Sequence, residues 1–349
     1  MPTLYGQEYS KEELRARCGQ MAQLAGVSRY ELQEGFERGV EICDVRTGSG
    51  FRFCVSPSRG MDITFAEHNG RPLCWNSSTG IRHPAYYCET NLGWLRGFYG
   101  GLLTTCGLQS FGVPCQDGGQ DGGEDSGEYF GIHDRASNLP ASHVSVSENW
   151  NDAGEYEISI QGTMRQTRVF GENLKWTRRI STSLGASTLL VRDSIINEGF
   201  ASTPIVILYH CNFGFPIVSE NSIIRMPSTH CQPRDANAAR TAANWNCFEA
   251  PAAGTEERCY FHTMQPDENG FVRAEIWNEK LNFGAFMRYS SYQFPFFTQW
   301  KTTDAGTYVN GLEPSNAPLA SRAELKEKGA LPMIEAGQEK VFEIELGVL

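Results

Sequence analysis

The sequence is poor in basic residues and has no long apolar run, and each of these shortages excludes a class of protein. Among its 349 residues, 30 lysines and arginines stand against 41 aspartates and glutamates, which gives a net charge of −11. This charge, without a lysine- or arginine-rich stretch, disfavours a nucleic-acid partner, because phosphate backbones bind basic surfaces. The apolar stretch 204–209 is far shorter than the ~20 residues of a membrane-spanning helix. Residues 1–19 are charged and lack an apolar segment, so we expect no signal peptide, no membrane partner and a cytoplasmic protein.

Close groups of metal-binding residues are also missing. The eleven cysteines are odd in number and scattered, with no Cys-x-x-Cys pair, so reduced thiols fit better than a disulfide framework or a structural zinc site. None of the seven histidines has the spacing His-x-His or His-x-x-x-His. The Gly- and Asp-rich stretch 116–127 lacks the lysine of a phosphate-binding loop and does not match the EF-hand pattern. We predict a loop there and no metal in the protein, with calcium as a less favoured alternative.

Strand signals are abundant. Apolar residues alternate with polar ones at 51–55, 144–147 and 156–160, which is the pattern of half-buried strands. The stretch 176–196 predicts a hairpin that turns at Gly185, and 204–209 predicts a further strand. Helical signals are few: Ser10 and Glu13 form a capping-box pattern, and 322–328 predicts a second short helix. No repeat and no linker divides the chain, so we predict one all-β domain over residues 1–349.

Two residues stand out as an acid–base pair. His210 comes directly after the predicted strand 205–209, where a polar side chain meets a rigid sheet. Glu313 follows the predicted strand 308–312 and precedes Pro314, which favours an extended backbone. A rim histidine bonded to the backbone is the simpler alternative for His210, and a solvated glutamate before a turn is the simpler alternative for Glu313.

Further candidates are side chains that could hold a sugar. Arg135, in the polar stretch 131–138 with His133, could bind a carboxylate or donate to sugar hydroxyls. A Trp300 ring could stack on a pyranose, although burial in the core explains a tryptophan equally well. Arg59 and Asp62 stand together in the stretch 59–62, which lies between two predicted strands. Lys301 follows Trp300, and Asn212 stands two residues after His210. For Arg59 with Asp62, and for Arg135 with Asp134, a structural ion pair is the alternative.

The order of five segments carries a resemblance that single residues do not. These segments are 58–62, 101–108, 131–138, 208–214 and 311–314. In this order the chain resembles the galactose-mutarotase-like superfamily, and within it the aldose 1-epimerase-related proteins. The resemblance implies a β-supersandwich with a sugar cleft on one sheet. It also implies that His210 matches the family's general acid, Glu313 its general base and His133 its upstream sugar-binding histidine.

The chain departs from the family's pattern at several positions. Asp134 stands where the family has glycine, and Tyr209 stands where it has asparagine. Arg59 and Arg96 are both candidates for the family's substrate-binding arginine, and its mid-chain aspartate has no assignable counterpart. The sugar is therefore left open. Two alternatives also stay open: a non-catalytic carbohydrate-binding or regulatory protein, and another isomerase or a lyase that uses Arg135 on an acidic sugar.

The resemblance implies mutarotation, the exchange of α and β anomers through the open-chain aldehyde. An ionised Glu313 would take the O1 proton while a protonated His210 donates to the ring oxygen, and closure on the other face would reverse both transfers. This chemistry needs no cofactor. His133, Arg135 and Asn212 would hold hydroxyls, and Trp300 would stack on the ring. The mechanism requires His210 to keep its proton near neutral pH while Glu313 stays charged, which their mutual attraction favours.

Overall fold

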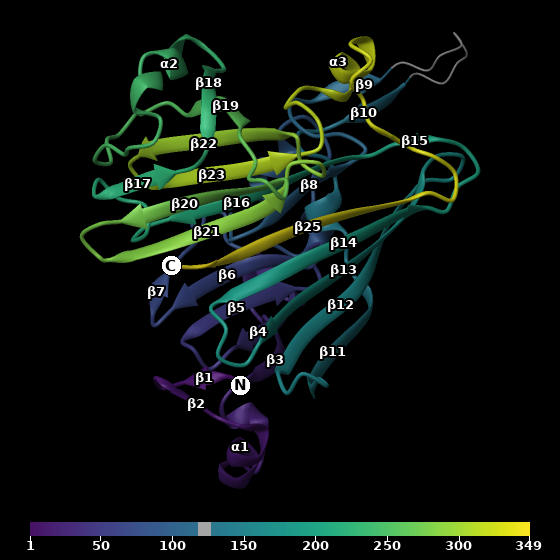
Figure 1. Ribbon diagram of the computed structural model, residues 1–349. Helices are drawn as coiled ribbons and strands as arrows, with labels where there is room; N and C mark the ends of the chain where they lie inside the picture. Colours follow the sequence, from purple (N-terminus) through teal and green to yellow (C-terminus); the bar gives the residue numbers. More distant parts are fainter. Residues whose placement is uncertain (118–126) are drawn as a thin grey trace.

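The computed structural model describes residues 1–117 and 127–349, and strands dominate them (Figure 1). The largest sheet has eight strands in the order β11 (Ser142–Trp150), β12 (Tyr156–Thr167), β13 (Asn173–Ser183), β14 (Thr188–Asn197), β25 (Glu339–Val348), β21 (Phe283–Ser290), β20 (Phe271–Asn278) and β17 (Ser222–Arg225). A six-stranded sheet has the order β18 (Ser228–Pro233), β19 (Arg258–Met264), β22 (Phe296–Asp304), β23 (Thr307–Ser315), β16 (Val206–Gly214) and β8 (Thr104–Leu108). A five-stranded sheet has the order β3 (Gly26–Glu31), β4 (Glu41–Arg46), β5 (Phe51–Ser56), β6 (Asp62–His68) and β7 (Arg71–Pro72).

Short elements complete the described part of the chain. Three two-stranded ladders pair β1 (Thr3–Leu4) with β2 (Gln7–Glu8), β9 (Cys115–Asp117) with β10 (Glu128–Phe130), and β15 (Thr203–Pro204) with β24 (Met333–Ile334). The helices are α1 (Lys11–Arg17), α2 (Ala236–Ala239) and α3 (Arg322–Glu327), with 3-10 turns η1 (Met21–Gln23), η2 (Gly35–Glu37), η3 (Pro84–Tyr86), η4 (Gly93–Arg96), η5 (Ala136–Asn138) and η6 (Ala242–Asn244). Figure 1 shows α1 at one end of the molecule and α2 and α3 at the other. No helix in the described ranges is long and apolar enough to cross a membrane.

The prediction of an all-β fold is confirmed, and so are several of its parts. The predicted hairpin 176–196 is β13 and β14, and the alternating stretch 51–55 lies in β5. Ser10 caps α1 with the expected capping box to Glu13, and the second predicted helix is α3. Of the predicted loop 116–127, residues 118–126 lie outside the described residues, whereas Asp117 belongs to β9.

The core lies where the eight-stranded sheet packs against the other two sheets. Every second residue of β13 is buried, as expected for a strand with one face in the core. Core side chains from all three sheets contact one another, among them Trp176 of the largest sheet, Tyr209 of the six-stranded sheet and Phe53 of the five-stranded sheet. This packing fixes the six-stranded sheet from behind, so that its other face is available for a site.

Strand β16 is buried on both faces, and the two faces do different things. Ile207, Tyr209 and Cys211 point into the main core. The residues between them point the other way, and Leu208 joins a second apolar cluster that includes Trp94. His210 shares this second direction because it alternates with Tyr209. Since β16 runs to Gly214, the strand continues past His210, whereas the sequence predicted that it ends there.

Candidate active site

His210 and Glu313 face each other across two neighbouring antiparallel strands. The register of β16 and β23 pairs Leu208 with Ser315 and Cys211 with Leu312, so His210 lies opposite Glu313. His210 Nε2 is 3.2 Å from Glu313 Oε1. Glu313 lies inside β23 rather than after it, and the following proline is part of the same strand. The sheet ladder, not a loop, thus sets the distance between the two side chains.

Gly311 makes room for this pair. It lies two residues before Glu313 on β23, so both project from the same face of the sheet. A Cβ added to Gly311 would lie 2.5 Å from Glu313 Oε1 and 3.3 Å from His210 Cε1. Only glycine therefore leaves the Glu313 carboxyl where it lies, over the backbone of its own strand.

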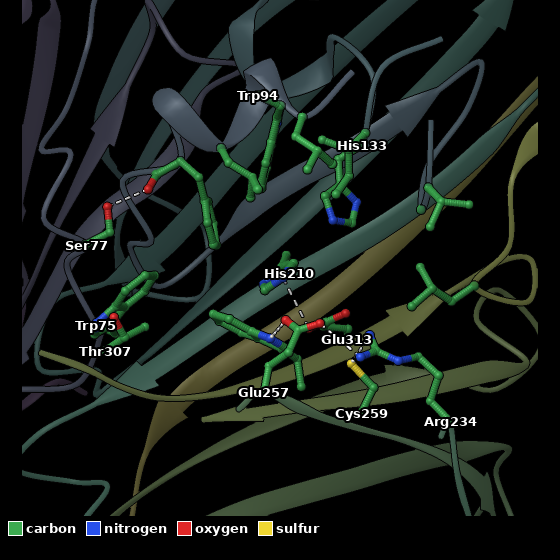
Figure 2. Close-up of a pocket in the computed structure, with 18 of the residues that line it drawn as sticks. Trp75, Ser77, Trp94, His133, His210, Arg234, Glu257, Cys259, Thr307 and Glu313 are labelled. Atoms are coloured by element: carbon green, nitrogen blue, oxygen red, sulfur yellow. Dashed lines mark hydrogen bonds and ion pairs between the residues drawn. The ribbon is translucent and has the colours of Figure 1, made fainter. Parts of the chain in front are cut away.

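The pair lies at the floor of a large cavity (Figure 2). The cavity has a volume of about 880 Å³, within the range of about 300–1,000 Å³ that is usual for small-molecule sites. Its floor is formed by the six-stranded sheet, with Trp300 from β22 and Cys259 from β19 beside the pair. His133 also lines it, and Figure 2 shows His133 and Glu313 on opposite sides of His210.

Aromatic rings form the wall next to His210. Trp94 and Phe98 are stacked with ring centroids 4.4 Å apart, and the Phe98 ring lies 5.1 Å from that of His210. The His133 ring is 4.7 Å from Trp94 and 5.9 Å from His210. Trp75 and Trp300 extend this wall on the other side of Phe98. Such ring faces offer stacking surface to the apolar side of a small ligand.

Burial shifts the pKa values of the pair, and it does so against the expectation from sequence. Burial, helped by the nearby His133, lowers the pKa of His210 to about 3. Burial and the negative charge of Glu257 raise the pKa of Glu313 well above its usual range. Burial thus disfavours the charged form of each side chain, so it favours a neutral His210 beside a protonated Glu313 over the corresponding ion pair. These directions run against the prediction that His210 keeps its proton near neutral pH while Glu313 stays charged.

Several polar atoms of the site have no partner. His210 Nδ1 and His133 Nδ1 are buried and make no hydrogen bond, and Glu313 Oε1 lies near His210 Nε2 without hydrogen-bond alignment. Burial lowers the pKa of His133 to about 4, so its ring is neutral as well. A buried polar atom without a partner costs free energy, about 1–3 kcal/mol each.

A second polar group, unforeseen from sequence, lies beside the pair. Arg234 donates to Cys259 Sγ at 3.0 Å, to Glu257 Oε1 at 2.9 Å and to Asp235 at 2.9 Å. Glu257 Oε2 accepts a hydrogen bond of 2.8 Å from Trp300 Nε1. These residues come from the ends of β18 and β19, and no motif marks them; only the strand order brings them next to Glu313.

Five residues that the sequence offered as sugar ligands do not line the cavity. Arg59 is buried elsewhere and donates to the carbonyls of Ser137, Arg82 and Gly97. Asp62 accepts from Arg178 and from Thr105, so the alternative of a structural ion pair holds, although with a different arginine.

The other three are also occupied by the protein. Arg135 pairs with Glu89 and Glu128, and Lys301 donates to main-chain carbonyls, at 2.7 Å to that of Cys247. Asn212 donates to the carbonyls of His210 and Gly101, which supports the backbone beside the pair. Of the nine predicted site residues, the cavity thus gathers His210, Glu313, His133 and Trp300.

Solved structures with the same fold define the class of this protein. A proposed aldose 1-epimerase from Klebsiella pneumoniae subsp. pneumoniae MGH 78578 superposes with a TM-score of 0.85 at 24% identity, over 93% of this chain and 83% of that one. A galactose mutarotase-like protein from Clostridium acetobutylicum gives 0.62 at 12% identity, over 94% and 99%. The galactose 1-epimerase from Lactobacillus acidophilus NCFM gives 0.61 at 11% identity, over 93% and 99%. The fold is therefore that of the galactose mutarotase-like β-sandwich proteins, which confirms the fold and the resemblance expected from sequence.

Within this class the chain belongs to a particular family. A family model described as Domain of unknown function (DUF4432) matches residues 37–348, and the chain is a member of that family. No curated protein matches the chain. The matched range includes every residue of the candidate site.

Proposed function

We propose that this protein is a mutarotase that exchanges the α and β anomers of a sugar, with His210 and Glu313 as its acid–base pair. One observation carries this proposal: the two side chains lie opposite each other, 3.2 Å apart, at the floor of an aromatic-walled cavity. Ring opening needs one acid and one base at the same time, on either side of one carbon atom. The names of the structural relatives agree with this chemistry.

The pair carries one proton between its two members, which is the number that the reaction requires. Burial favours this proton on Glu313, because it disfavours charge on either group. A bound sugar brings hydroxyl donors to the carboxylate and an acceptor, its ring oxygen, to the imidazole. These hydrogen bonds favour the charged forms, so the proton moves to His210, which then acts as the acid while Glu313 acts as the base.

Ring opening and closure then need only two proton transfers. Glu313 takes the proton from O1 while His210 donates to the ring oxygen, and the bond between C1 and the ring oxygen breaks. The aldehyde turns about its bond to C2, and closure on the other face returns both protons. His133 and Trp300 are positioned to hold a hydroxyl and the ring face, and the aromatic wall keeps water out.

Anomer exchange measured by NMR on a panel of aldoses tests the proposal. We expect the intact protein to accelerate exchange of at least one sugar, and His210→Ala and Glu313→Gln each to lower this acceleration by about 10²–10⁴-fold. Both variants should keep the wild-type circular dichroism spectrum. Near-normal exchange in either folded variant would remove that residue from the mechanism, and a new product of different mass or ultraviolet absorbance would favour a lyase or another isomerase instead.

A non-catalytic carbohydrate-binding role is the second candidate. Burial favours the neutral form of both His210 and Glu313, and a site of neutral donors and acceptors beside aromatic rings also suits simple sugar binding. Binding of a sugar without acceleration of its anomer exchange would decide for this alternative.

A further inference from the structure

The cavity is larger than one sugar ring needs, and its outer part differs in character from its floor. Its volume of about 880 Å³ lies near the upper end of the range of about 300–1,000 Å³ typical of drug-sized ligands. The polar side chains His210, Glu313 and His133 gather at one end, against the sheet. The space beyond them is lined mainly by apolar side chains.

Three exposed apolar side chains converge on the mouth of the cavity. Leu92 is 54% exposed, Leu95 44% and Val113 59%, and all three line the cavity. They come from two separate segments, the turn η4 before β8 and the stretch between β8 and β9. We call Leu92, Leu95 and Val113 the apolar lip. Single exposed leucines are common on proteins, but an apolar group gathered at a cavity mouth is typical of a binding surface.

The apolar lip is continuous with the aromatic wall. Ile132, Leu319 and Ala320 also line the cavity and pack against the buried cluster that contains Trp94. A ligand whose ring rests on the floor and whose other end reaches the lip would therefore contact apolar surface over most of its length. A second sugar unit against the apolar lip would lose hydrogen bonds of its hydroxyls to water, and the side chains of Leu92, Leu95 and Val113 offer no partners in return, which costs free energy.

The charges of the cavity do not favour an anionic ligand. Arg234 is the only arginine or lysine among the described residues that line it. Its guanidinium is already bound by the carboxylates of Asp235 and Glu257, and Glu324 adds a further acidic side chain to the lining. Arg135, which the sequence offered as a clamp for an acidic sugar, is paired with Glu89 and Glu128 instead.

We propose that the substrate is a neutral sugar with a free anomeric carbon and an apolar substituent on another oxygen. The sugar ring lies on the floor at His210 and Glu313, and the substituent lies against the apolar lip. This inference rests on the proposed function for its requirement of a free anomeric carbon. The binding of the substituent is a separate property of the cavity and can be measured without turnover.

The experiment compares three sets of reducing sugars. The first contains O-benzyl ethers of D-galactose and D-glucose at O3, O4 and O6, the second the unsubstituted sugars, and the third lactose and maltose, which extend the sugar by a polar unit. Affinity is measured by calorimetry and by quenching of the fluorescence of Trp75, Trp94 and Trp300, which line the cavity. We expect at least one benzyl ether to bind about 10- to 100-fold more tightly than its parent and than the disaccharides.

Variants of the lip show where the gain arises. Leu95→Ser and Val113→Ser should each weaken the affinity for the benzyl ether several-fold. The affinity for the parent sugar should stay unchanged. Val169→Ser is the matched control, because Val169 is 80% exposed and does not line the cavity. The inference is overturned if all three sets bind with equal affinity, or if the disaccharides gain as much as the ethers. It is also overturned if the lip variants behave like Val169→Ser.

The outcomes also separate this inference from the proposed function. Tight, lip-dependent binding of a benzyl ether without acceleration of anomer exchange supports the inference and contradicts mutarotation. Accelerated exchange of the unsubstituted sugars, with no gain from the benzyl group, supports mutarotation and overturns the inference.

Discussion

Two buried polar groups lie on opposite faces of β16, and they differ in how completely they are satisfied. On the core face, Arg178 donates to both oxygens of Asp193, at 2.8 and 2.7 Å, and to Asp62 at 2.8 Å. It also donates to Thr105, and Tyr209 donates to Asp193. We call Arg178, Asp62 and Asp193 the ionic clamp. On the cavity face, one residue along the strand, His210 has a nitrogen with no partner.

The difference separates a buried polar group that is fully hydrogen-bonded within the fold from one that is not. In the ionic clamp the guanidinium and both carboxylates are fully buried and hydrogen-bonded, so the group holds β6, β13 and β14 together. At the cavity, the polar atoms of His210 and Glu313 are left without aligned partners, which costs stability. A cost of this kind persists where function requires it.

The largest expected effect is on stability and comes from breaking the ionic clamp. Arg178→Met leaves the two carboxylates of Asp62 and Asp193 buried without their cation, and we expect a loss of about 3–5 kcal/mol in the free energy of unfolding. Arg179→Met is the matched control, because the next residue on β13 is part-exposed and pairs with Glu157 at the surface. That variant should lose at most about 1 kcal/mol. Chemical denaturation followed by circular dichroism measures both, and equal losses would remove the distinction between the two pairs.

Glu313→Gln should raise the free energy of unfolding, in contrast to Arg178→Met, which lowers it. Burial raises the pKa of Glu313, so an ionisable side chain is held there against its preference, and an amide of the same shape removes this penalty. Because the folded protein holds the proton more tightly than the unfolded chain, the penalty appears above the unfolded pKa and grows as pH rises. We expect the variant to be as stable as the wild type at pH 5 and more stable at pH 8, by thermal denaturation. A less stable variant at pH 8 would mean that Glu313 contributes to the fold.

Gly311→Ala should damage the site without damaging the fold. The added methyl group falls 2.5 Å from Glu313 Oε1, so the carboxyl must move, and a displacement of about 1 Å costs on the order of 10²-fold in rate. Gly19→Ala is the control, because its Cβ would meet nothing within 4 Å. Anomer exchange by NMR measures the effect, and full activity of Gly311→Ala would show that the carboxyl position is not critical.

The pH dependence of activity should be the smallest effect over the usual range. The pair holds one proton from above the pKa of His210, which is about 3, up to the raised pKa of Glu313. Activity should therefore be nearly constant across neutral pH, fall in acid when the pair gains a second proton, and fall in base when it loses its only one. A midpoint near pH 6.5, the ordinary pKa of histidine, would show that His210 titrates as an independent group.

The fold class and the candidates His210 and Glu313 could be predicted from the sequence. The alternation of residues that marks strands is a local pattern, and the order of the matching segments can be read directly along the chain. Period-two alternation marks strands such as β5, and the order of short segments marks His210 and Glu313. The sequence placed both residues at strand ends, since Asn212, Gly214 and Pro314 are typical of turns. Burial on both faces overrides that preference: β16 and β23 lie between sheet neighbours whose ladders carry them past these residues.

The remaining site residues could not be predicted because their positions depend on contacts between distant segments. Arg234 and Glu257 come together only because β18 and β19 are neighbours in the sheet. Conversely, Arg59 and Asp62 stand in a polar motif that looks like a binding site. In the folded chain, however, Arg59 donates to a main-chain carbonyl and Asp62 accepts from Arg178. The number of partners that a polar side chain already has is a property of the folded chain, and no local pattern reports it.

The alternation of Tyr209 and His210 along β16 determines which parts of the cavity depend on the register of the sheet. A slip of one residue in β16 would exchange the two side chains between core and cavity, so the position of His210 is fixed together with the register of the sheet. The apolar lip is free of this constraint, because Leu92, Leu95 and Val113 lie outside the sheets. Under the proposed function, substitutions in the lip would therefore change which sugars bind without moving His210 or Glu313.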